Sequence, residues 1–441
     1  MDSRFLIHNL HLESLDTFKN RDPNLARLKN MPYVFNSSLI QIFPVHIPGI
    51  YSLGGGRQIG KSTLLKQWML HLMEQENVPP ENIAFFSGEL IDDHHAFLRL
   101  LETQLSQMPA GLCYIIIDEV TYIKNWDKAV KYAADAGMLV NIELFLTGSD
   151  LVLMQEARKT FPGRRGSADV VDFHLYPLSF RELLDLKGNL QVLENPIQYD
   201  LLMSEFNSYL QHGGYLTAIN DIALYGKILT ATFATYSDWI RGDMLKRGKQ
   251  DVYLREIINA IIKRYSSQLN STWNSLAKEL SIDHHKTVAD YVELLQSMDA
   301  VYIQSCLQED TLLPSPKKAK KLMFTDPFIY HALNAWLNNA TIENDPDIVS
   351  KLVETTVVTH FRRKYPTYYI GAEGEVDLAY VDQNQFWPIE VKWTQQLRTK
   401  DLKQVLKYQN SKIFAKSVGI EQVHGIPTIF LPYALGMFSY Q

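Results

Sequence analysis

The sequence has few cysteines, no long apolar run and no excess of positive charge, and each of these absences excludes a class of protein. Its two cysteines, Cys113 and Cys306, are too few and too distant for a disulfide framework, and they favour a reducing cytoplasm. No stretch approaches the roughly 18 apolar residues of a membrane span, and the first residues lack a signal-peptide core. The net charge of −6 gives no overall attraction to nucleic acid or to an anionic membrane. We therefore expect a cytoplasmic protein with no membrane partner.

What is present is typical of a globular protein, since 46% of the 441 residues are apolar and 21% are charged. A chain of this length predicts about three domains. Apolar runs alternate with helical patterns over about the first 180 residues. The run from Tyr114 to Ile117 is continuous, as in strands buried on both faces of a parallel sheet. We predict an α/β fold there, with a helix-covered parallel sheet.

The clearest motif is a phosphate-binding pattern, G-x-x-x-x-G-K-[ST], which begins at Gly55 and ends at Ser62. Its glycines let the backbone bend until its N–H groups face a phosphate chain. Lys61 is expected to reach the β- and γ-phosphates in a catalytic role, and the Ser62 hydroxyl to ligand Mg²⁺. An apolar strand precedes the motif and an amphipathic helix follows it. We predict that ATP and Mg²⁺ bind here, through Gly55, Gly56, Arg57, Gln58, Ile59, Gly60, Lys61, Ser62 and Thr63.

A second acidic motif ends an apolar strand about 55 residues later, at Asp118 and Glu119. We predict that Asp118 holds the Mg²⁺ hydration shell and that Glu119 polarises the attacking water; the alternative is plain surface charge. Thr147 and Ser149 end the next strand, where a hydroxyl would orient the water or sense the γ-phosphate. The alternative there is a simple turn, with Ser149 or Asp150 as a helix N-cap.

Two adjacent arginines, Arg164 and Arg165, lie between glycines just before the fifth predicted strand. A guanidinium presented to a neighbouring subunit's γ-phosphate would act as an arginine finger, which requires a homo-oligomer. The alternative is a pair of solvated arginines on a loop. Both interpretations stay open at the level of the sequence.

These motifs, together with Asp22-Pro23, Pro32-Tyr33 and the stretch Tyr176 to Leu183 (YPLSFREL), resemble a group of bacterial and archaeal AAA+-type ATPases. In that group the ATPase core is followed by a winged helix and by a domain of the PD-(D/E)xK nuclease type. The resemblance covers nearly the whole chain, and the Gly213-Gly214-Tyr215 break is one of its more specific marks. Members usually carry proline after this break, whereas this chain has Leu216.

The resemblance implies a P-loop NTPase fold, followed by a helical and winged-helix region and a restriction-endonuclease-like α/β domain. The expected segments are a helical lead-in at 1–46, an AAA+-like ATPase core at 47–180, a helical lid at 181–250, a winged helix at 251–325 and a nuclease-like domain at 326–441.

Within the predicted winged helix, Ser275 to Met298 form a helix-turn-helix pattern, and the segments 301–304 and 320–324 supply two wing strands. The second helix carries acidic residues beside Lys286, whereas a DNA-reading helix needs positive charge near phosphates. A protein-contact or structural role is therefore expected over base-specific DNA binding. The lysine cluster from Lys317 to Lys321 is a candidate for phosphate contact without sequence preference.

In the last segment, Asp377, Glu390 and Lys392 match the D…ExK pattern and are the expected catalytic residues. Glu390 and Lys392 are two apart, so both project from one face of a strand. Two carboxylates at one site can hold Mg²⁺, and a lysine beside them can orient a water or stabilise the phosphorane charge. By the resemblance, Glu354 stands where related nuclease folds add a metal ligand. The metal ligands expected here are thus Glu354, Asp377 and Glu390.

Two functional hypotheses follow. The first is an ATPase coupled to a Mg²⁺-dependent DNA-processing nuclease-like domain, which Asp377, Glu390 and Lys392 favour. The second is a nucleotide-driven switch or assembly protein whose last domain binds nucleic acid or protein without cleavage. The negative net charge and the non-basic helix favour the second. ATP hydrolysis is common to both.

Overall fold

The computed structural model describes residues 2–148, 159–194, 198–267, 270–339, 345–394 and 402–439. The chain forms two compact units, Met1–Tyr176 and Pro177–Gln441. Among the described residues, no helix is both long and apolar enough to cross a membrane.

The first unit is built on a five-stranded sheet in the order β2-β3-β4-β1-β5, in which every pair of neighbours is parallel. This confirms the predicted parallel α/β fold. The strands are β1 (Gly49–Gly54), β2 (Ile83–Ser87), β3 (Cys113–Asp118), β4 (Ile142–Thr147) and β5 (Asp172–His174). Because β4 lies between β1 and β3, the end of β4 stands between the phosphate loop and Asp118.

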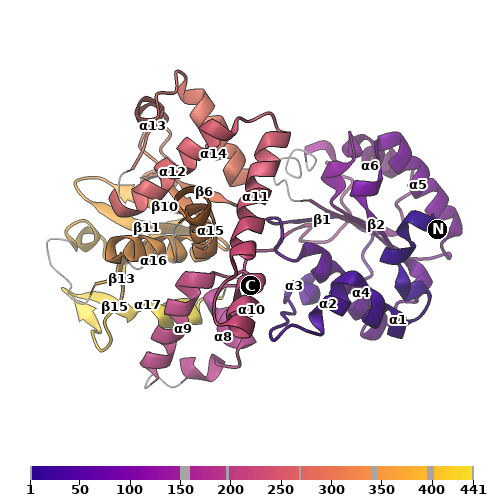
Figure 1. Ribbon diagram of the computed structural model, residues 1–441, viewed down its shortest axis with the longest axis horizontal. Coiled ribbons are helices and arrows are strands. Elements are labelled where there is room, and N and C mark those ends of the chain that lie inside the picture. Colours follow the sequence, from indigo (N-terminus) through magenta and orange to yellow (C-terminus); the bar gives the residue numbers. More distant parts are fainter. Residues whose placement is uncertain are drawn as a thin grey trace. The chain divides into compact units, whose positions relative to one another are not determined.

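Helices cover both faces of this sheet, with α1 to α4 on one side and α5 and α6 on the other (Figure 1). The α-helices are α1 (Leu15–Arg21), α2 (Pro23–Leu28), α3 (Leu39–Ile42), α4 (Lys61–Glu74), α5 (His94–Gln107) and α6 (Trp126–Asp135). Short 3₁₀ turns are η1 (Ser3–His8), η2 (Leu10–Leu12), η3 (Pro80–Asn82), η4 (Gly88–Leu90) and η5 (Val120–Tyr122).

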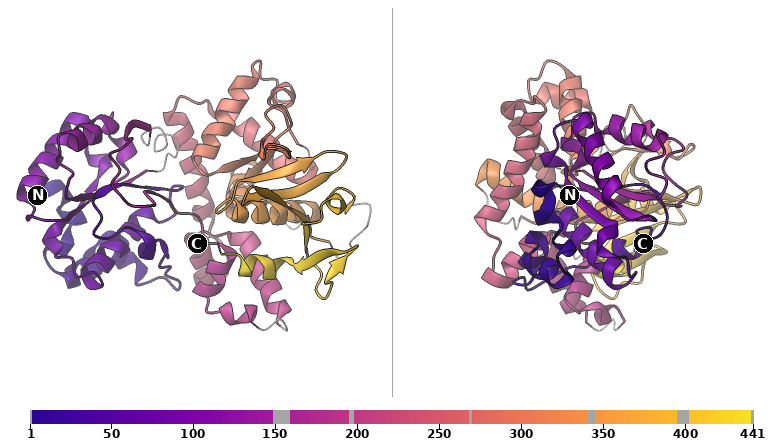
Figure 2. Two further views of the ribbon diagram at one scale, coloured as in Figure 1. Left: turned by 180° about the vertical axis from the view of Figure 1, so that it is seen from behind. Right: turned by 90° about the vertical axis from the view of Figure 1, so that its right-hand side faces the viewer.

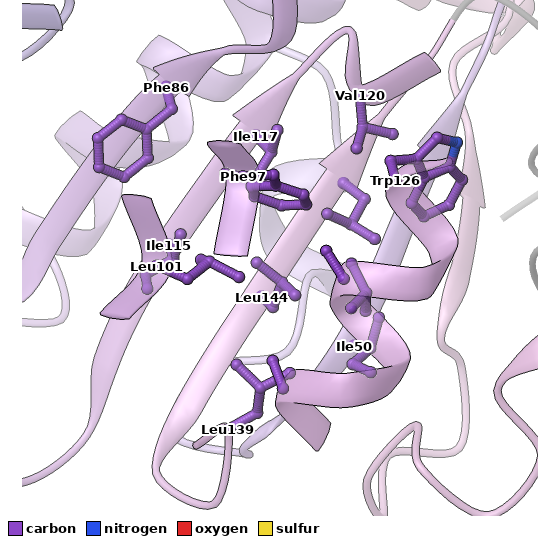
Figure 3. Packing of buried hydrophobic residues seen from close by; sticks show 14 of the residues in the cluster. Ile50, Phe86, Phe97, Leu101, Ile115, Ile117, Val120, Trp126, Leu139 and Leu144 are labelled. Carbon is purple, nitrogen blue, oxygen red and sulfur yellow. The ribbon is translucent and has the colours of Figure 1, made fainter. Parts of the chain in front are cut away.

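The apolar run of β3 contributes side chains to two separate cores, because successive strand residues point to opposite faces of the sheet. Ile115 and Ile117 lie beside Phe97 and Leu101 of α5, in a core that also contains Trp126 of α6 (Figure 3). The intervening residues of β3 belong to the second core, beneath α4. A continuous apolar strand is therefore what this double-sided burial requires.

The N-terminal lead-in is tied to α4 by a buried ion pair. Asp22 caps α2 and lies 3.3 Å from the ammonium of Lys66, and both side chains are fully buried. The ammonium also stands 3.7 Å from the centre of the Phe85 ring, a cation–π contact. Burial lowers the pKa of Lys66 to about 8. Asp22-Pro23 therefore begins α2, and Asp22 is also the salt-bridge partner of Lys66.

The second unit begins with helices and continues into two small sheets and a larger one. Its helices are α8 (Phe180–Leu186), α9 (Tyr199–His212), α10 (Leu216–Tyr225), α11 (Thr230–Lys246), α12 (Asp251–Ser267), α13 (Trp273–Glu279), α14 (His285–Ser297), α15 (Pro327–Asn338), α16 (Pro346–Phe361) and α17 (Leu431–Met437), with 3₁₀ turns η6 (Leu190–Leu193) and η8 (Val405–Lys407). Strands β6 (Val301–Gln304) and β9 (Lys321–Phe324) pair antiparallel, and so do β7 (Leu307–Gln308) and β8 (Leu313–Pro314).

The larger sheet has six strands in the order β10-β11-β12-β13-β15-β14, and α16 packs on β11 and β12 (Figure 2). Its strands are β10 (Thr367–Gly371), β11 (Glu375–Asp382), β12 (Gln385–Lys392), β13 (Lys412–Ala415), β14 (Gln422–Val423) and β15 (Ile426–Phe430). β11 and β12 form the hairpin expected from the sequence. Gln383 and Asn384 form its two-residue turn with positive φ values of 48° and 58°, as type I′ hairpin turns require.

Candidate functional site

The phosphate loop joins the end of β1 to the start of α4. At its first glycine, Gly55, φ is 149°, and an added Cβ would lie 2.6 Å from the Leu175 carbonyl oxygen. At its last, Gly60, φ is 103°, so this residue turns the chain into α4. Lys61 and Ser62 thus fall in the first turn of a 14-residue helix, where backbone N–H groups attract anions.

The loop's polar side chains face the end of β3. The Ser62 Oγ donates to Asp118 Oδ2 over 2.6 Å. The Lys61 ammonium is almost fully buried and donates to the carbonyl oxygens of Gly55 and Gly56 at 3.1 and 3.0 Å. It also lies 3.5 Å from Glu119 Oε1. The structure therefore brings together four residues of the predicted nucleotide site, namely Lys61, Ser62, Asp118 and Glu119.

Thr147, at the end of β4, fixes the acidic pair from the side. Its Oγ1 donates to Asp118 Oδ1 over 2.6 Å and accepts the Glu119 N–H over 2.9 Å. Glu119 adopts the left-handed conformation, with φ of 54°, which is uncommon outside glycine. The Glu119 Oε2 is buried and accepts no hydrogen bond from the described residues. The carboxylate is thus fixed through its backbone and keeps one oxygen without a partner among the described residues.

The other residues of the predicted nucleotide site lie in the same loop and helix. Arg57 donates to the Tyr122 hydroxyl over 2.5 Å and stacks on its ring. Gln58 has a positive φ of 57°, and Ile59 and Thr63 are half-buried. Ser149 lies outside the described residues.

The donor set fits Mg²⁺. The Ser62 hydroxyl in the first turn of α4 and the Asp118 carboxylate at the end of β3 lie 2.6 Å apart, and both are hard oxygen ligands of the kind that Mg²⁺ prefers beside nucleotide phosphates. Ser62 and Asp118 would hold the ion, which supplies charge neutralisation and orientation of the phosphates when bound.

The two arginines pair with carboxylates of their own chain. Arg165 is mostly buried and contacts Asp172 of β5 through two nitrogens, at 2.8 and 2.5 Å. It also donates to the Ile50 and Val171 carbonyls. Arg164 pairs with Asp135 at the end of α6 in a more exposed contact. These contacts favour a structural role for Arg165. The exposed ion pair of Arg164 is expected to contribute little to stability.

The predicted C-terminal residues meet at one end of β11 and β12. Asp377 Oδ2 accepts the Val391 N–H over 2.9 Å, and Glu390 Oε1 lies 2.6 Å from the Lys392 ammonium. Glu354 of α16 is held by Lys351, whose ammonium lies 2.8 Å from both carboxylate oxygens.

A residue from the lysine cluster also enters this group. Lys321 Nζ lies 2.8 Å from Glu354 Oε1, 2.5 Å from Glu375 Oε1 and 3.6 Å from Asp377 Oδ1. Only 2% of its side chain is exposed. As a candidate for phosphate contact, the Lys317–Lys321 cluster therefore does not include Lys321, because three carboxylates of the same chain surround it.

Burial and neighbouring charges shift the pKa values of this group in opposite directions. Burial and the nearby Asp377 raise the pKa of Glu390 to about 8. Burial opposes ionisation of Glu354, but Lys321 and Lys351 outweigh it and lower the pKa of this carboxyl. Burial likewise opposes the charge of Lys321, but its carboxylate neighbours raise its pKa.

Several participating residues carry no motif that would have singled them out. Gly88 lets the Glu119 carbonyl approach, since an added Cβ would lie 2.4 Å from that oxygen. Tyr122 receives Arg57, and Glu375 contacts Lys321. Only Glu375 offered a signal, because it stands two residues before Asp377 and shares its strand face.

Three protein families match parts of the chain. A family described as "AAA domain" matches residues 48–184, which contain the phosphate loop, Asp118, Glu119 and Thr147. The match supports an AAA+-type P-loop ATPase. Two further families, both described as domains of unknown function, match residues 203–340 (DUF8612) and 349–425 (DUF4143).

Among curated proteins, the chain is similar to "Uncharacterized protein MJ1544" of Methanocaldococcus jannaschii, with 27% identity over 150 residues. The alignment covers 33% of this chain and about a third (32%) of that relative.

Among solved structures, similar chains include a Walker-type ATPase of Pyrococcus abyssi, with 14% identity, a TM-score of 0.42 and coverage of 73% of this chain and 97% of that one. RuvB of Thermotoga maritima gives 16% identity and a TM-score of 0.29, with coverage of 58% and 81%. The DNA clamp loader delta protein of Bacillus subtilis gives 12% and 0.26, with coverage of 57% and 84%. Similarities at this level carry no functional argument, and the ATPase assignment rests on the AAA-domain match and the site geometry.

Proposed function

We propose that the first unit binds ATP with Mg²⁺ and hydrolyses it. The observation that carries the proposal is the contact between the loop and the acidic strand end, made by Ser62 and Asp118 beside Lys61 and Glu119. In this arrangement the loop N–H groups and Lys61 bind the phosphates. Thr147 keeps Asp118 and Glu119 in place, and Glu119 accepts a proton from the attacking water.

The test is nucleotide binding and phosphate release by the Lys61→Ala variant. We expect weaker ATP binding and loss of turnover, because the phosphates lose the point charge that the loop supplies. The control is Lys131→Ala, which changes an exposed lysine of the same unit. Lys66→Met is unsuitable, because the Lys66 ammonium is buried in an ion pair. Equal ATP binding and turnover in wild type and Lys61→Ala would refute the proposal.

For the second unit we propose a nucleotide-driven binding module that contacts nucleic acid or protein without cutting it. This includes a winged helix formed by α12 to α14 and the β6–β9 pair, with a protein-contact or structural role. The supporting observation is that Glu354, Asp377 and Glu390 each lie beside a lysine ammonium.

The second candidate is a Mg²⁺-dependent DNA-processing nuclease with a PD-(D/E)xK-like domain. It is favoured by the position of Asp377 and Glu390 on neighbouring strands, with Lys392 beside Glu390. Incubation of the chain with plasmid DNA, ATP and Mg²⁺ separates the two candidates. Nicked or linear products that are lost in Lys392→Ala support the nuclease, and intact plasmid supports the binding module.

A further inference from the structure

Lys321 occupies the centre of the acidic group in the second unit. Its strand, β9, precedes the elements that carry the three carboxylates, with Glu354 on α16 and Glu375 and Asp377 on β11. The three distances from its Nζ run from 2.5 to 3.6 Å. A buried ammonium is stable in a protein when carboxylates pair with it, so the side chain and its neighbours stabilise one another.

A divalent cation would need the same oxygens. Mg²⁺ and Ca²⁺ bind carboxylates at about 2.0–2.6 Å, and so would stand where the ammonium now lies. The ammonium and a divalent cation cannot share this position, and side by side in a poorly solvated site they would repel each other strongly. In the part of the chain that the structure describes, no group of three or more His, Cys, Asp or Glu side chains has the arrangement of a metal site.

Each of the predicted metal ligands is already matched by a lysine. Glu354 contacts Lys321 and Lys351, and Asp377 faces Lys321. Glu390 contacts Lys392. The residues therefore do not fit the divalent metal that a nuclease-like domain implies.

We propose that the Lys321 ammonium takes the place of a divalent cation between Glu354, Glu375 and Asp377, so that this group of carboxylates is metal-free in the native chain. The cation is then supplied by the chain itself and cannot exchange with solvent. It serves structure rather than transition-state stabilisation, since an ammonium fixed by three carboxylates has no open position for a phosphate oxygen. The inference does not depend on ATP hydrolysis.

A second set of contacts shows what the buried lysine joins. The β6–β9 pair also reaches the larger sheet through Tyr302, whose hydroxyl contacts Thr367, and through Gln304, whose amide donates to the Asp377 carbonyl over 3.0 Å. Lys321 thus adds an ionic link between the β6–β9 pair and the sheet. Removing its charge would leave the three neighbouring carboxylates, two of them mostly buried, repelling one another, and another cation would relieve this repulsion.

The test is a Mn²⁺ titration of the full chain, followed by the electron paramagnetic resonance signal of free Mn²⁺. Asp118→Asn is present throughout, so that the nucleotide site does not contribute. With Lys321 in place we expect no saturable binding. Lys321→Met should gain one Mn²⁺ per chain and a higher melting temperature with Mn²⁺, and a further Asp377→Asn change should abolish both effects. Lys318→Met, at an exposed position of the same cluster, should gain neither.

Two results would overturn the proposal. One is binding of one Mn²⁺ per chain with Lys321 intact that Asp377→Asn removes. The other is a folded Lys321→Met chain that binds no Mn²⁺. If Lys321→Met does not fold without metal, recovery of its melting transition by Mn²⁺ supports the proposal, and failure to recover contradicts it. Lys321→Arg, which keeps the charge, should fold and stay metal-free.

Discussion

At the scale of single residues, Glu119 combines backbone strain with a positioned carboxylate. Its left-handed conformation has a φ of 54°, and strain of this kind costs about 1–3 kcal/mol and persists only where the surroundings enforce it. Here the Thr147 hydroxyl accepts a hydrogen bond from the Glu119 N–H, and Gly88, which has no Cβ, leaves space for the Glu119 carbonyl. The consequence is a carboxylate directed toward Lys61, 3.5 Å away. Strained residues cluster at active sites, so the conformation of Glu119 supports its proposed catalytic role.

The sequence could predict the residues whose chemistry is tied to a spacing. Lys61, Ser62 and Asp118 belong to motifs whose residue types are dictated by phosphate and Mg²⁺, and the structure brings them together. It could not predict Tyr122 or the position of Lys321, because their roles depend on which strands and turns become neighbours. A cluster of lysines in the sequence does not show which of its members becomes buried.

A pH dependence of stability is expected from Glu143, a buried residue of β4 whose Oε1 accepts the Ile47 N–H over 2.7 Å. Burial raises its pKa from 4.5 to about 8. Between these values the folded chain holds a proton that the unfolded chain releases, so this residue's contribution to stability is full below pH 4.5 and is lost as the pH rises toward 8. The loss amounts to at most about 1.4 kcal/mol per pH unit.

The Glu143→Gln variant should remove this dependence. Its melting temperature relative to wild type should therefore rise steadily between pH 5 and pH 8, as a series of thermal unfolding curves would measure. The exposed Glu102→Gln variant is the control and should show no such trend. Parallel curves for wild type and Glu143→Gln across this range would show that Glu143 is not held protonated.

At the scale of elements, the Gly213-Gly214 break is a packing point between α9, α10 and α15. The Asp326 carboxylate accepts the Gly214 N–H over 2.9 Å and also caps α15 through the Phe328 N–H. A Cβ on Gly213 would lie 1.6 Å from Asp326 Oδ1, and its φ is 56°. The break itself was predicted from the sequence, but its partner, more than a hundred residues away, was not.

Gly213→Ala should destabilise the second unit by about 3 kcal/mol or more, because it displaces a buried carboxylate that serves two N–H groups. Gly226→Ala is the matched control, since Gly226 ends α10 with a φ of 70° and an added Cβ would meet nothing within 4 Å. There only the left-handed conformation is penalised, by about 1–2 kcal/mol. Urea unfolding of both variants measures the difference, and equal losses would contradict the role given to Asp326.

The elements themselves were largely predictable where the hydrophobic period is strong. The apolar run of β3, the β11–β12 hairpin and the helix-turn-helix of α13 and α14 all lie where the sequence pattern indicated. The short strands β7 and β8 were not foreseen, because two-residue strands leave no periodicity to detect.

At the scale of the whole molecule, the predicted boundary between residues 325 and 326 stays a prediction, although contacts of the second unit run across it. Lys321 contacts Glu354, and Tyr302 contacts Thr367. A sequence pattern marks where one type of element gives way to another, but long-range ion pairs decide which elements depend on each other. We therefore expect residues 251–325 and 326–441 to unfold together.

A homo-oligomer remains a prediction that Arg164 can test. Its ion pair with Asp135 is exposed, so the guanidinium is able to turn toward a neighbouring subunit's nucleotide at little cost. Mixing Arg164→Ala with Lys61→Ala should then give more phosphate release than the two variants separately, because one mixed interface regains both residues. The control is Lys159→Ala, an exposed change near Arg164 in the sequence. When it is mixed with Lys61→Ala, phosphate release should equal that of wild type mixed with Lys61→Ala. A monomer by light scattering, without complementation, would leave Arg164 as a surface residue.

The central claim is that the first unit is an ATPase in which Glu119 activates water. Its most direct test compares wild type with Glu119→Gln for ATP binding, by a fluorescent ATP analogue, and for phosphate release under saturating ATP and Mg²⁺. We predict that binding is retained and that turnover falls on the order of 10²-fold or more, since the amide cannot accept the proton. Equal turnover in the two proteins would contradict the account.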